Sequence, residues 1–174
     1  MTLAIWLVLG ACAVAVATDV AARRIPNALT LSLALAALII HATQGWTSLA
    51  VAVAALCGVT FVGFLAFNFG WLGGGDVKLL AAAAAAFGFP DALSFLLYTA
   101  IGGGVLAIVF AVATGRFAPV MRSVVLILRP FAFKGTAPVP PRNPIMLPYG
   151  CAIAFGAVLV ALSHTTAPFL RLPL

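Results

Sequence analysis

The stretch Phe69–Pro90, FGWLGGGDVKLLAAAAAAFGFP, contains three consecutive glycines followed by an aspartate and a lysine, and this polar part lies between two long apolar runs. The runs are apolar enough to be membrane helices, and that property decides the fold. Asp76, within the stretch, is one of only three acidic residues in the 174-residue chain. A carboxylate in a membrane is energetically costly and indicates a functional site or a paired partner. Asp76 is therefore the first candidate site residue.

The composition is typical of a protein with several membrane spans. Hydrophobic residues make up 65% of the chain and charged residues 7%, and the mean hydropathy is +1.25. Soluble domains contain about 25% charged residues. We therefore expect an all-α polytopic membrane protein with a single membrane-embedded domain over residues 1–174. Membrane lipid is an expected partner, and no sequence pattern sets the oligomeric state.

The net charge of +6 does not indicate a nucleic-acid partner, because the basic residues lie in short segments between apolar runs. This pattern is typical of the loops that membrane proteins keep in the cytoplasm. Cys12, Cys57 and Cys151 lie in apolar stretches without a CxxC pair or a neighbouring histidine. We therefore expect no metal site, no disulfide framework and no cofactor.

Six apolar segments predict six transmembrane helices. They are Leu3–Thr18, Ala28–Ala42, Leu49–Phe69, Val77–Phe89, Asp91–Thr114 and Tyr149–Ala167. The fourth and fifth are separated at Gly88–Asp91, because glycine and proline interrupt helices. The fourth would rise only about 20 Å at 1.5 Å per residue, so we expect the glycine run to form a loop that dips into the membrane beside it. Gly58 and Gly63 of the third predict close contacts with neighbouring helices.

The distribution of charge orients these helices. The loops after the first, third and fifth contain eight of the nine Lys and Arg residues, and only Arg171 lies on the opposite side. The positive-inside rule then places these loops in the cytoplasm and both termini outside it. Asp19, at the end of the first helix, and Asp76, at the start of the fourth, consequently lie at one cytoplasmic face. His41, His164 and Asp91 lie at the other face, where we expect interfacial histidines and a helix cap at Asp91.

The segment Gly115–Pro148 has two interpretations. Arg122 and Arg129 are seven residues apart and share one face of a helix whose other face is aliphatic, which suits a helix lying in the inner membrane surface. A solvated loop that only sets the topology explains the same residues equally well.

Two carboxylates at one face suggest a chemical function. When Asp19 and Asp76 share a site, both cannot ionise cheaply, so one keeps a proton. The ionised member can activate water against a peptide carbonyl while the protonated member donates to the carbonyl oxygen. The alternative is that Asp76 merely caps the fourth helix, with Lys78 balancing its charge. Capping alone does not explain the three glycines before it.

Three motifs in order resemble the type IV prepilin peptidases, membrane aspartic proteases of the GxGD class. These motifs are Asp19 with Ile25-Pro26-Asn27, then Gly73-Gly74-Gly75-Asp76-Val77-Lys78, then Leu147-Pro148-Tyr149-Gly150. The resemblance covers essentially the whole chain. It implies a fold of six membrane helices with Asp19 and Asp76 as the catalytic aspartates.

The resemblance also implies a substrate. Such enzymes remove a short basic leader from pilin-like precursors at the cytoplasmic side of the bacterial inner membrane, after a glycine that precedes the pilin's hydrophobic helix. The other motif residues are expected to support the site or contact the substrate: Gly73, Gly74, Gly75, Lys78, Pro26, Asn27, Pro148, Tyr149 and Gly150. Arg24 joins them, because Ala21 stands where many relatives have a basic residue and Arg23 or Arg24 can substitute for it. For Lys78 a structural role is favoured.

Larger members of the family add a cytoplasmic region with paired cysteines and also methylate the new amino terminus. This chain begins directly with its first apolar segment, so we expect no soluble methyltransferase-type domain and cleavage without methylation. In this respect it resembles the short peptidases of tight-adherence, or Flp-type, pilus systems.

Two other functions remain alternatives. In a small ion- or proton-coupled transporter subunit, Asp19 and Asp76 would bind cations or protons near a broken helix. The predicted location of both at one face, and not at the midplane, argues against this function. A presenilin-like protease that cuts within the bilayer is the nearer alternative.

Overall fold

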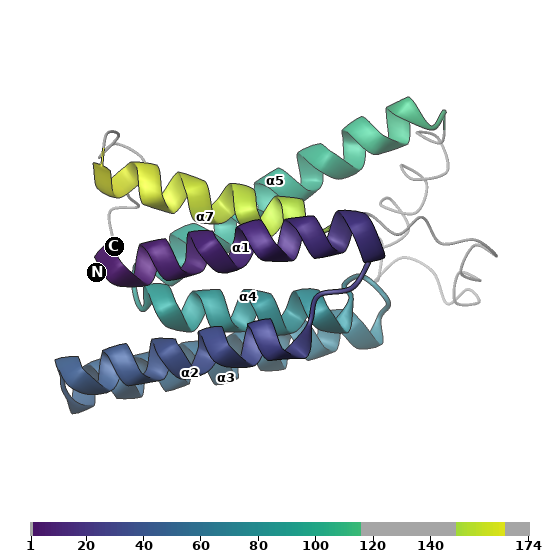
Figure 1. Cartoon of the computed structure of the whole chain (residues 1–174). Helices are drawn as coiled ribbons and strands as arrows, with labels where there is room; N and C mark the ends of the chain where they lie inside the picture. The colour runs from purple at the N-terminus through teal and green to yellow at the C-terminus, as the bar shows by residue number, and fades with distance from the viewer. Residues whose placement is uncertain (1, 116–148, 166–174) are drawn as a thin grey trace, which may run out of the picture. The chain divides into compact units, whose positions relative to one another are not determined.

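The computed structural model describes residues 2–115 and 149–165, and the regular elements of these residues are all α-helices (Figure 1). The helices are α1 (Thr2–Ala22), α2 (Asn27–Gln44), α3 (Trp46–Asn68), α4 (Gly74–Phe87), α5 (Asp91–Ala113) and α7 (Tyr149–Thr165). The prediction of an all-α protein is confirmed. The helix expected between the fifth and sixth segments lies outside the described residues.

Each predicted apolar segment corresponds to one helix. Four of the helices, α1, α2, α3 and α5, are long and apolar enough to cross a membrane. Helix α7 has 17 residues and α4 has 14. The predicted break between the fourth and fifth segments is correct, since α4 ends at Phe87 and α5 begins at Asp91. Helix α1 continues to Ala22, so Asp19 lies in its last turn and does not end it.

The chain divides into two compact units, Met1–Gly103 with Pro148–Leu174, and Gly104–Leu147. The described part of the second unit is the C-terminal half of α5 and the two residues after it. Asp19 and Asp76 both belong to the first unit.

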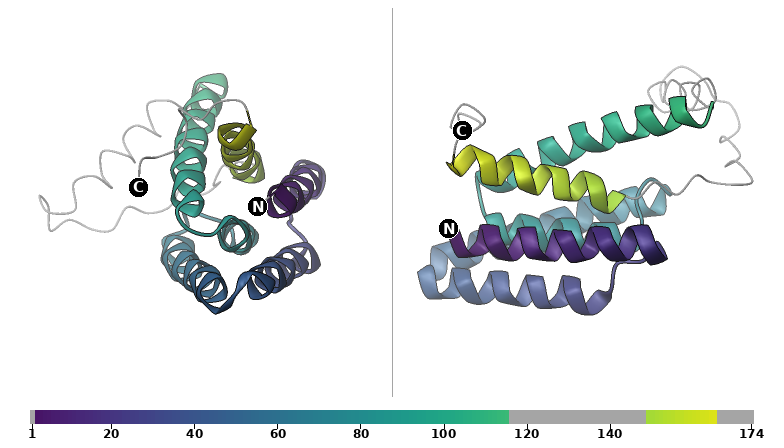
Figure 2. Two further views of the ribbon diagram at one scale, coloured as in Figure 1. Left: turned by 90° about the vertical axis from the view of Figure 1, so that its left-hand side faces the viewer. Right: turned by 45° about the horizontal axis from the view of Figure 1, so that its top comes forward.

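Helix α4 is the core of the first unit. It packs against α1, α2, α3 and α7, and the end-on view in Figure 2 shows it between α1, α2 and α3. All residues from Ala81 to Phe87 are buried, as expected for a helix that is apolar on every face. Six consecutive alanines let the surrounding helices approach closely. The short helix α4 is therefore central in the first unit and is enclosed by its neighbours.

Two predictions about glycines are wrong. Gly74 and Gly75 form the first turn of α4, and Gly73 has extended backbone at φ −75°, so the run does not form the expected loop. The chain turns earlier, at Gly70, whose φ is +72°. Gly63 makes the expected close contact, because a Cβ there would lie 2.6 Å from Val77 Cγ1. At Gly58 no described atom lies within 4 Å of the Cβ position, so that glycine is not at a helix contact.

Candidate active site

Asp19 connects the end of α1 to the beginning of α7. Its side chain is buried, and its Oδ2 accepts a hydrogen bond of 3.1 Å from the backbone N–H of Gly150. Gly150 is in the first turn of α7, where unpaired N–H groups and the helix dipole favour a negative charge. A Cβ at Gly150 would lie 3.1 Å from the same oxygen. A larger residue there would therefore shift the Asp19 carboxyl by a few tenths of an ångström.

Asp76 is the third residue of α4 and is half-buried. Its Oδ2 accepts a hydrogen bond of 3.2 Å from the N–H of Gly73, which is the N-cap residue of the helix. A Cβ on Gly73 would lie 2.8 Å from this oxygen. The prediction that Asp76 is the N-cap is thus wrong, because Gly73 is the N-cap and Asp76, at the third helical position, bonds back to the backbone of Gly73.

The two carboxylates interact with each other. Asp76 precedes the apolar part of α4, which starts at Leu79. Burial raises the pKa of the Asp76 carboxyl from 3.8 to about 6, the negative charge of Asp19 adds to the increase, and the Gly73 hydrogen bond opposes it. A carboxyl that keeps its proton near another carboxylate can act as an acid while its neighbour acts as a base.

The connection between α1 and α2 packs against the start of α4. Ile25 fills the space beside Gly75, where a Cβ would lie 3.2 Å from the Ile25 Cβ. Asn27, the first residue of α2, accepts a hydrogen bond of 2.8 Å from Lys78 Nζ at its Oδ1. These two contacts hold the first turns of α4 beside the end of α1. The role of the Gly75 position is therefore to accept Ile25, not to supply backbone flexibility.

The remaining predicted residues differ in their placement. Tyr149 begins α7, is half-buried and is close enough to Asp76 to interact electrostatically with it. Its hydroxyl oxygen lies 2.7 Å from the position of a Cβ on Gly103. Pro26 is exposed, and its carbonyl oxygen accepts hydrogen bonds from the first turn of α2. Arg24 is exposed. Pro148 lies outside the described residues.

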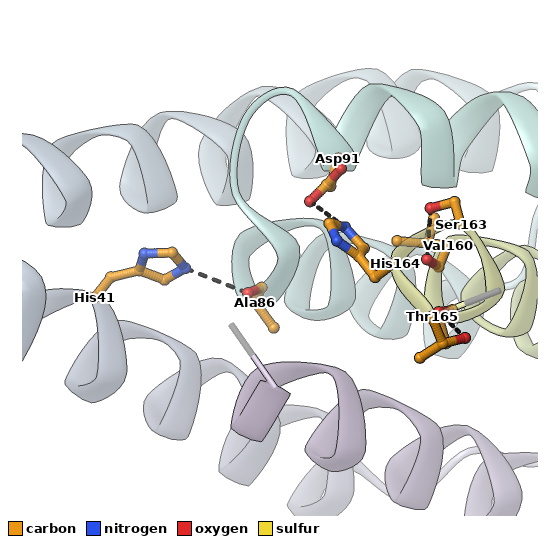
Figure 3. Close-up of polar contacts among 8 residues, drawn as sticks. His41, Ala86, Asp91, Val160, Ser163, His164 and Thr165 are labelled. Carbon is orange, nitrogen blue, oxygen red and sulfur yellow. Dashed lines mark hydrogen bonds and ion pairs between the residues drawn. The ribbon is translucent and has the colours of Figure 1, made fainter. Parts of the chain in front are cut away.

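The other end of the unit contains a separate set of polar contacts (Figure 3). His41 lies 2.7 Å from Ser48 Oγ through Nδ1 and 3.3 Å from the Ala86 carbonyl oxygen through Nε2. His164 Nε2 lies 2.8 Å from Asp91 Oδ2. Asp91 is the first residue of α5, and its contact with His164 was not predicted. The sequence offered a basis for predicting this contact, because the predicted topology already placed Asp91 and His164 at one face.

Residues from these two ends line two cavities. One, of about 340 Å³, is lined by residues that include His41 and Ser48. The other, of about 430 Å³, lies between α2, α3 and α4 and includes Asn27 and Lys78. In the described ranges 2–115 and 149–165, no cluster of three His, Cys, Asp or Glu residues could hold a metal ion.

The chain was compared with known proteins. A family model described as the type IV leader peptidase family matches residues 6–108, which is more than half of the chain and includes Asp19 and Asp76. No curated protein matches significantly, and neither does any solved structure. The resemblance noted in the sequence is thereby confirmed at the level of the family. The chain belongs to the type IV leader peptidase family, a family of proteases.

Proposed function

We propose that this protein is a membrane aspartic endopeptidase that removes the leader from type IV pilin-like precursors, with Asp19 and Asp76 as its catalytic pair. One observation carries the proposal. The fold brings the carboxylates of α1 and α4 to one end of the first unit, where they interact and where each accepts a backbone hydrogen bond. The third acidic residue, Asp91, is paired with His164 instead.

The proposed reaction assigns one role to each carboxyl. Asp76, which keeps its proton to a higher pH, donates to the oxygen of the scissile carbonyl. Asp19 takes a proton from the attacking water, so that a tetrahedral intermediate forms. Asp19 then gives its proton to the leaving amine while the intermediate collapses and returns a proton to Asp76. The C–N bond breaks, and the pair regains its original protonation state.

The hydrogen bonds at the site support this division of roles. The Gly150 N–H, in the first turn of α7, holds the Asp19 carboxyl through its Oδ2, which fixes the position of the proposed base. The partial burial of Asp76 favours its neutral form. Similar arrangements, with two carboxyls in unequal environments, supply the acid and the base of other hydrolases.

The proposal also includes the location of the protein and the class of its substrate. The basic residues favour a multi-pass protein of the bacterial inner membrane, with the aspartate pair at the cytoplasmic face and both termini outside. The short α4 and α7 complete six spans. The resemblance to Flp-type peptidases favours a Flp-type precursor.

The proposal is tested by comparing three substitutions at the three acidic positions. Membranes that contain the wild type, Asp19→Asn, Asp76→Asn or Asp91→Asn are incubated with a pilin-like precursor, and the initial cleavage rate is measured. We expect each of the first two variants to lose about a thousandfold or more in kcat/KM. Asp91→Asn should cleave normally per folded molecule, because Asp91 is at the opposite end of the unit.

Cleavage at the wild-type rate by either Asp19→Asn or Asp76→Asn would contradict the proposed pair. A transporter would give a different result. It would leave the precursor intact and show a proton-coupled flux that both substitutions abolish.

A further inference from the structure

Tyr149, the first residue of α7, lies at the aspartate pair. The next residue, Gly150, donates its backbone N–H to Asp19 Oδ2 at 3.1 Å. The Tyr149 side chain is close enough to Asp76 to interact electrostatically with it. Two adjacent residues of α7 therefore approach the two carboxyls of the proposed pair, one through its backbone and one through a phenol.

A glycine of α5 leaves room for the Tyr149 hydroxyl. A Cβ on Gly103 would lie 2.7 Å from the hydroxyl oxygen and 3.0 Å from the adjoining ring carbon Cζ. Real Cβ atoms do not come so close to other atoms, so any side chain at position 103 would push the hydroxyl away. The bare backbone of Gly103 thus determines where the hydroxyl of Tyr149 lies.

The packing of α7 on α5 continues beyond this contact. A Cβ on Gly156 would collide with Thr99 Oγ1 and would lie 3.0 Å from the backbone oxygen of Phe95. Tyr149 thus faces Gly103, and Gly156, two turns further along α7, faces Thr99, one turn earlier on α5. Small residues allow membrane helices to approach this closely. The Tyr149 ring is therefore held by two helices packed in a fixed register, as a group that acts in catalysis must be.

The chemistry of the phenol suits the reaction assigned to the aspartates. A neutral phenol donates one hydrogen bond. In the proposed reaction Asp76 enters protonated and gives its proton to the oxygen of the scissile carbonyl. Negative charge develops on that oxygen as water attacks, so it attracts a donor more strongly than a protonated carboxyl does. The acceptor that best fits the Tyr149 hydroxyl is therefore the substrate oxygen.

We propose that the Tyr149 hydroxyl, held in place against Gly103, donates a hydrogen bond to the oxygen of the scissile carbonyl beside Asp76. The inference rests on the proposed function. A carbonyl oxygen has two lone pairs, so it can accept from both groups. Tyr149 keeps its own proton throughout, and the proton transfers of the two aspartates are unchanged. Its contribution is to stabilise the charge that develops on the oxygen.

Tyr149→Phe tests the hydroxyl directly, because it removes one oxygen atom and keeps the ring. Tyr98→Phe is the matched control, since Tyr98 is the only other tyrosine of the chain. Each full-length protein is purified in detergent and given a pilin-like precursor, and kcat and KM are measured per folded molecule. We expect Tyr149→Phe to lower kcat about fivefold, the effect of one neutral hydrogen bond. KM should stay unchanged, because the bond strengthens only in the transition state.

Gly103→Ala moves the hydroxyl without removing it. Gly58→Ala is the control, because it adds the same Cβ to a helix where no described atom lies within 4 Å. We expect Gly103→Ala to lower kcat severalfold in the wild type and to have little further effect in Tyr149→Phe, since both changes act through one hydrogen bond. Equal losses in the two backgrounds would overturn the inference, because Gly103 would then not act through the hydroxyl.

Two further results would overturn the inference. One is a wild-type kcat in Tyr149→Phe. The other is a wild-type maximal kcat with a shifted pH profile, which would mean that the hydroxyl acts on Asp76 and not on the substrate. Failure of the proposed function has a different signature, in which the wild type itself leaves the precursor intact.

Discussion

The acidic residues at the two ends of the first unit have different hydrogen-bond partners. At one end Asp19 and Asp76 each accept a hydrogen bond from a backbone N–H near the start of a helix. The two carboxylates also interact electrostatically with each other. At the other end Asp91 is paired with a basic partner, His164. The Asp91 carboxyl is held by a side chain of another helix, whereas Asp19 and Asp76 are held by backbone N–H groups. The contrast separates the proposed active site from a contact between α5 and α7.

Among substitutions that keep all three aspartates, the largest effect on activity is expected from Gly150→Ala. The new Cβ would lie 3.1 Å from Asp19 Oδ2, so the carboxylate must move away from the α7 backbone. A shift of a few tenths of an ångström at a catalytic group should lower kcat/KM roughly tenfold. Gly10→Ala is the control, because no described atom lies within 4 Å of its Cβ position. Equal activity of both variants in a cleavage assay would show that the Gly150 hydrogen bond does not position Asp19.

Asp91→Ala should affect the opposite end and change stability more than activity. It leaves His164, a partly buried side chain, without its carboxylate. The expected loss is about 1–2 kcal/mol of unfolding free energy. Thermal unfolding in detergent, followed by the activity per folded molecule, measures both quantities. A loss of activity without a loss of stability would mean that this end takes part in cleavage.

The hydrogen bond from Lys78 to Asn27 should contribute less, because both side chains are exposed. We expect Lys78→Ala and Asn27→Ala each to lower stability by less than about 1 kcal/mol. The double variant should be no worse than either single one, because both remove the same contact. Much slower cleavage by Lys78→Ala than by Asn27→Ala would instead show that Lys78 takes part in the chemistry.

The smallest expected effect is a shift in the titration of Asp76. Its pKa is raised to about 6 mainly by burial and secondly by Asp19, so Asp19→Asn should lower the midpoint only in part. Carbon-13 NMR of labelled aspartate carboxyls would measure it. The raised pKa makes protonated Asp76 stabilise the fold at low pH, because the folded protein holds this proton to a higher pH than the unfolded chain. This stabilising contribution of Asp76 to the free energy of unfolding is complete below about pH 3.8 and is lost as the pH rises through about 6. An unchanged midpoint in Asp19→Asn would mean that the two carboxyls do not interact.

Much of the fold follows from local sequence. Continuous apolar runs predict helices because the backbone must satisfy its own hydrogen bonds in a membrane. Gly88 and Pro90 mark the break before α5 correctly, because neither residue favours a continued helix. Counting the alternation of segments also placed His164 and Asp91 at one end. The mistake at Gly74 and Gly75 arose because helix propensity is weak compared with the packing that surrounds α4.

The sequence by itself therefore determined the apolar helices, the family and the candidate aspartates, since these depend on composition and on short motifs. Only the tertiary structure decided which backbone groups hold those aspartates. The contact of Gly150 with Asp19, the packing of Ile25 on Gly75 and the bond between Asn27 and Lys78 join residues far apart in the chain. Such contacts depend on whether a side chain or only a hydrogen fits between two helices. That space exists only after α4 has been enclosed by its neighbours.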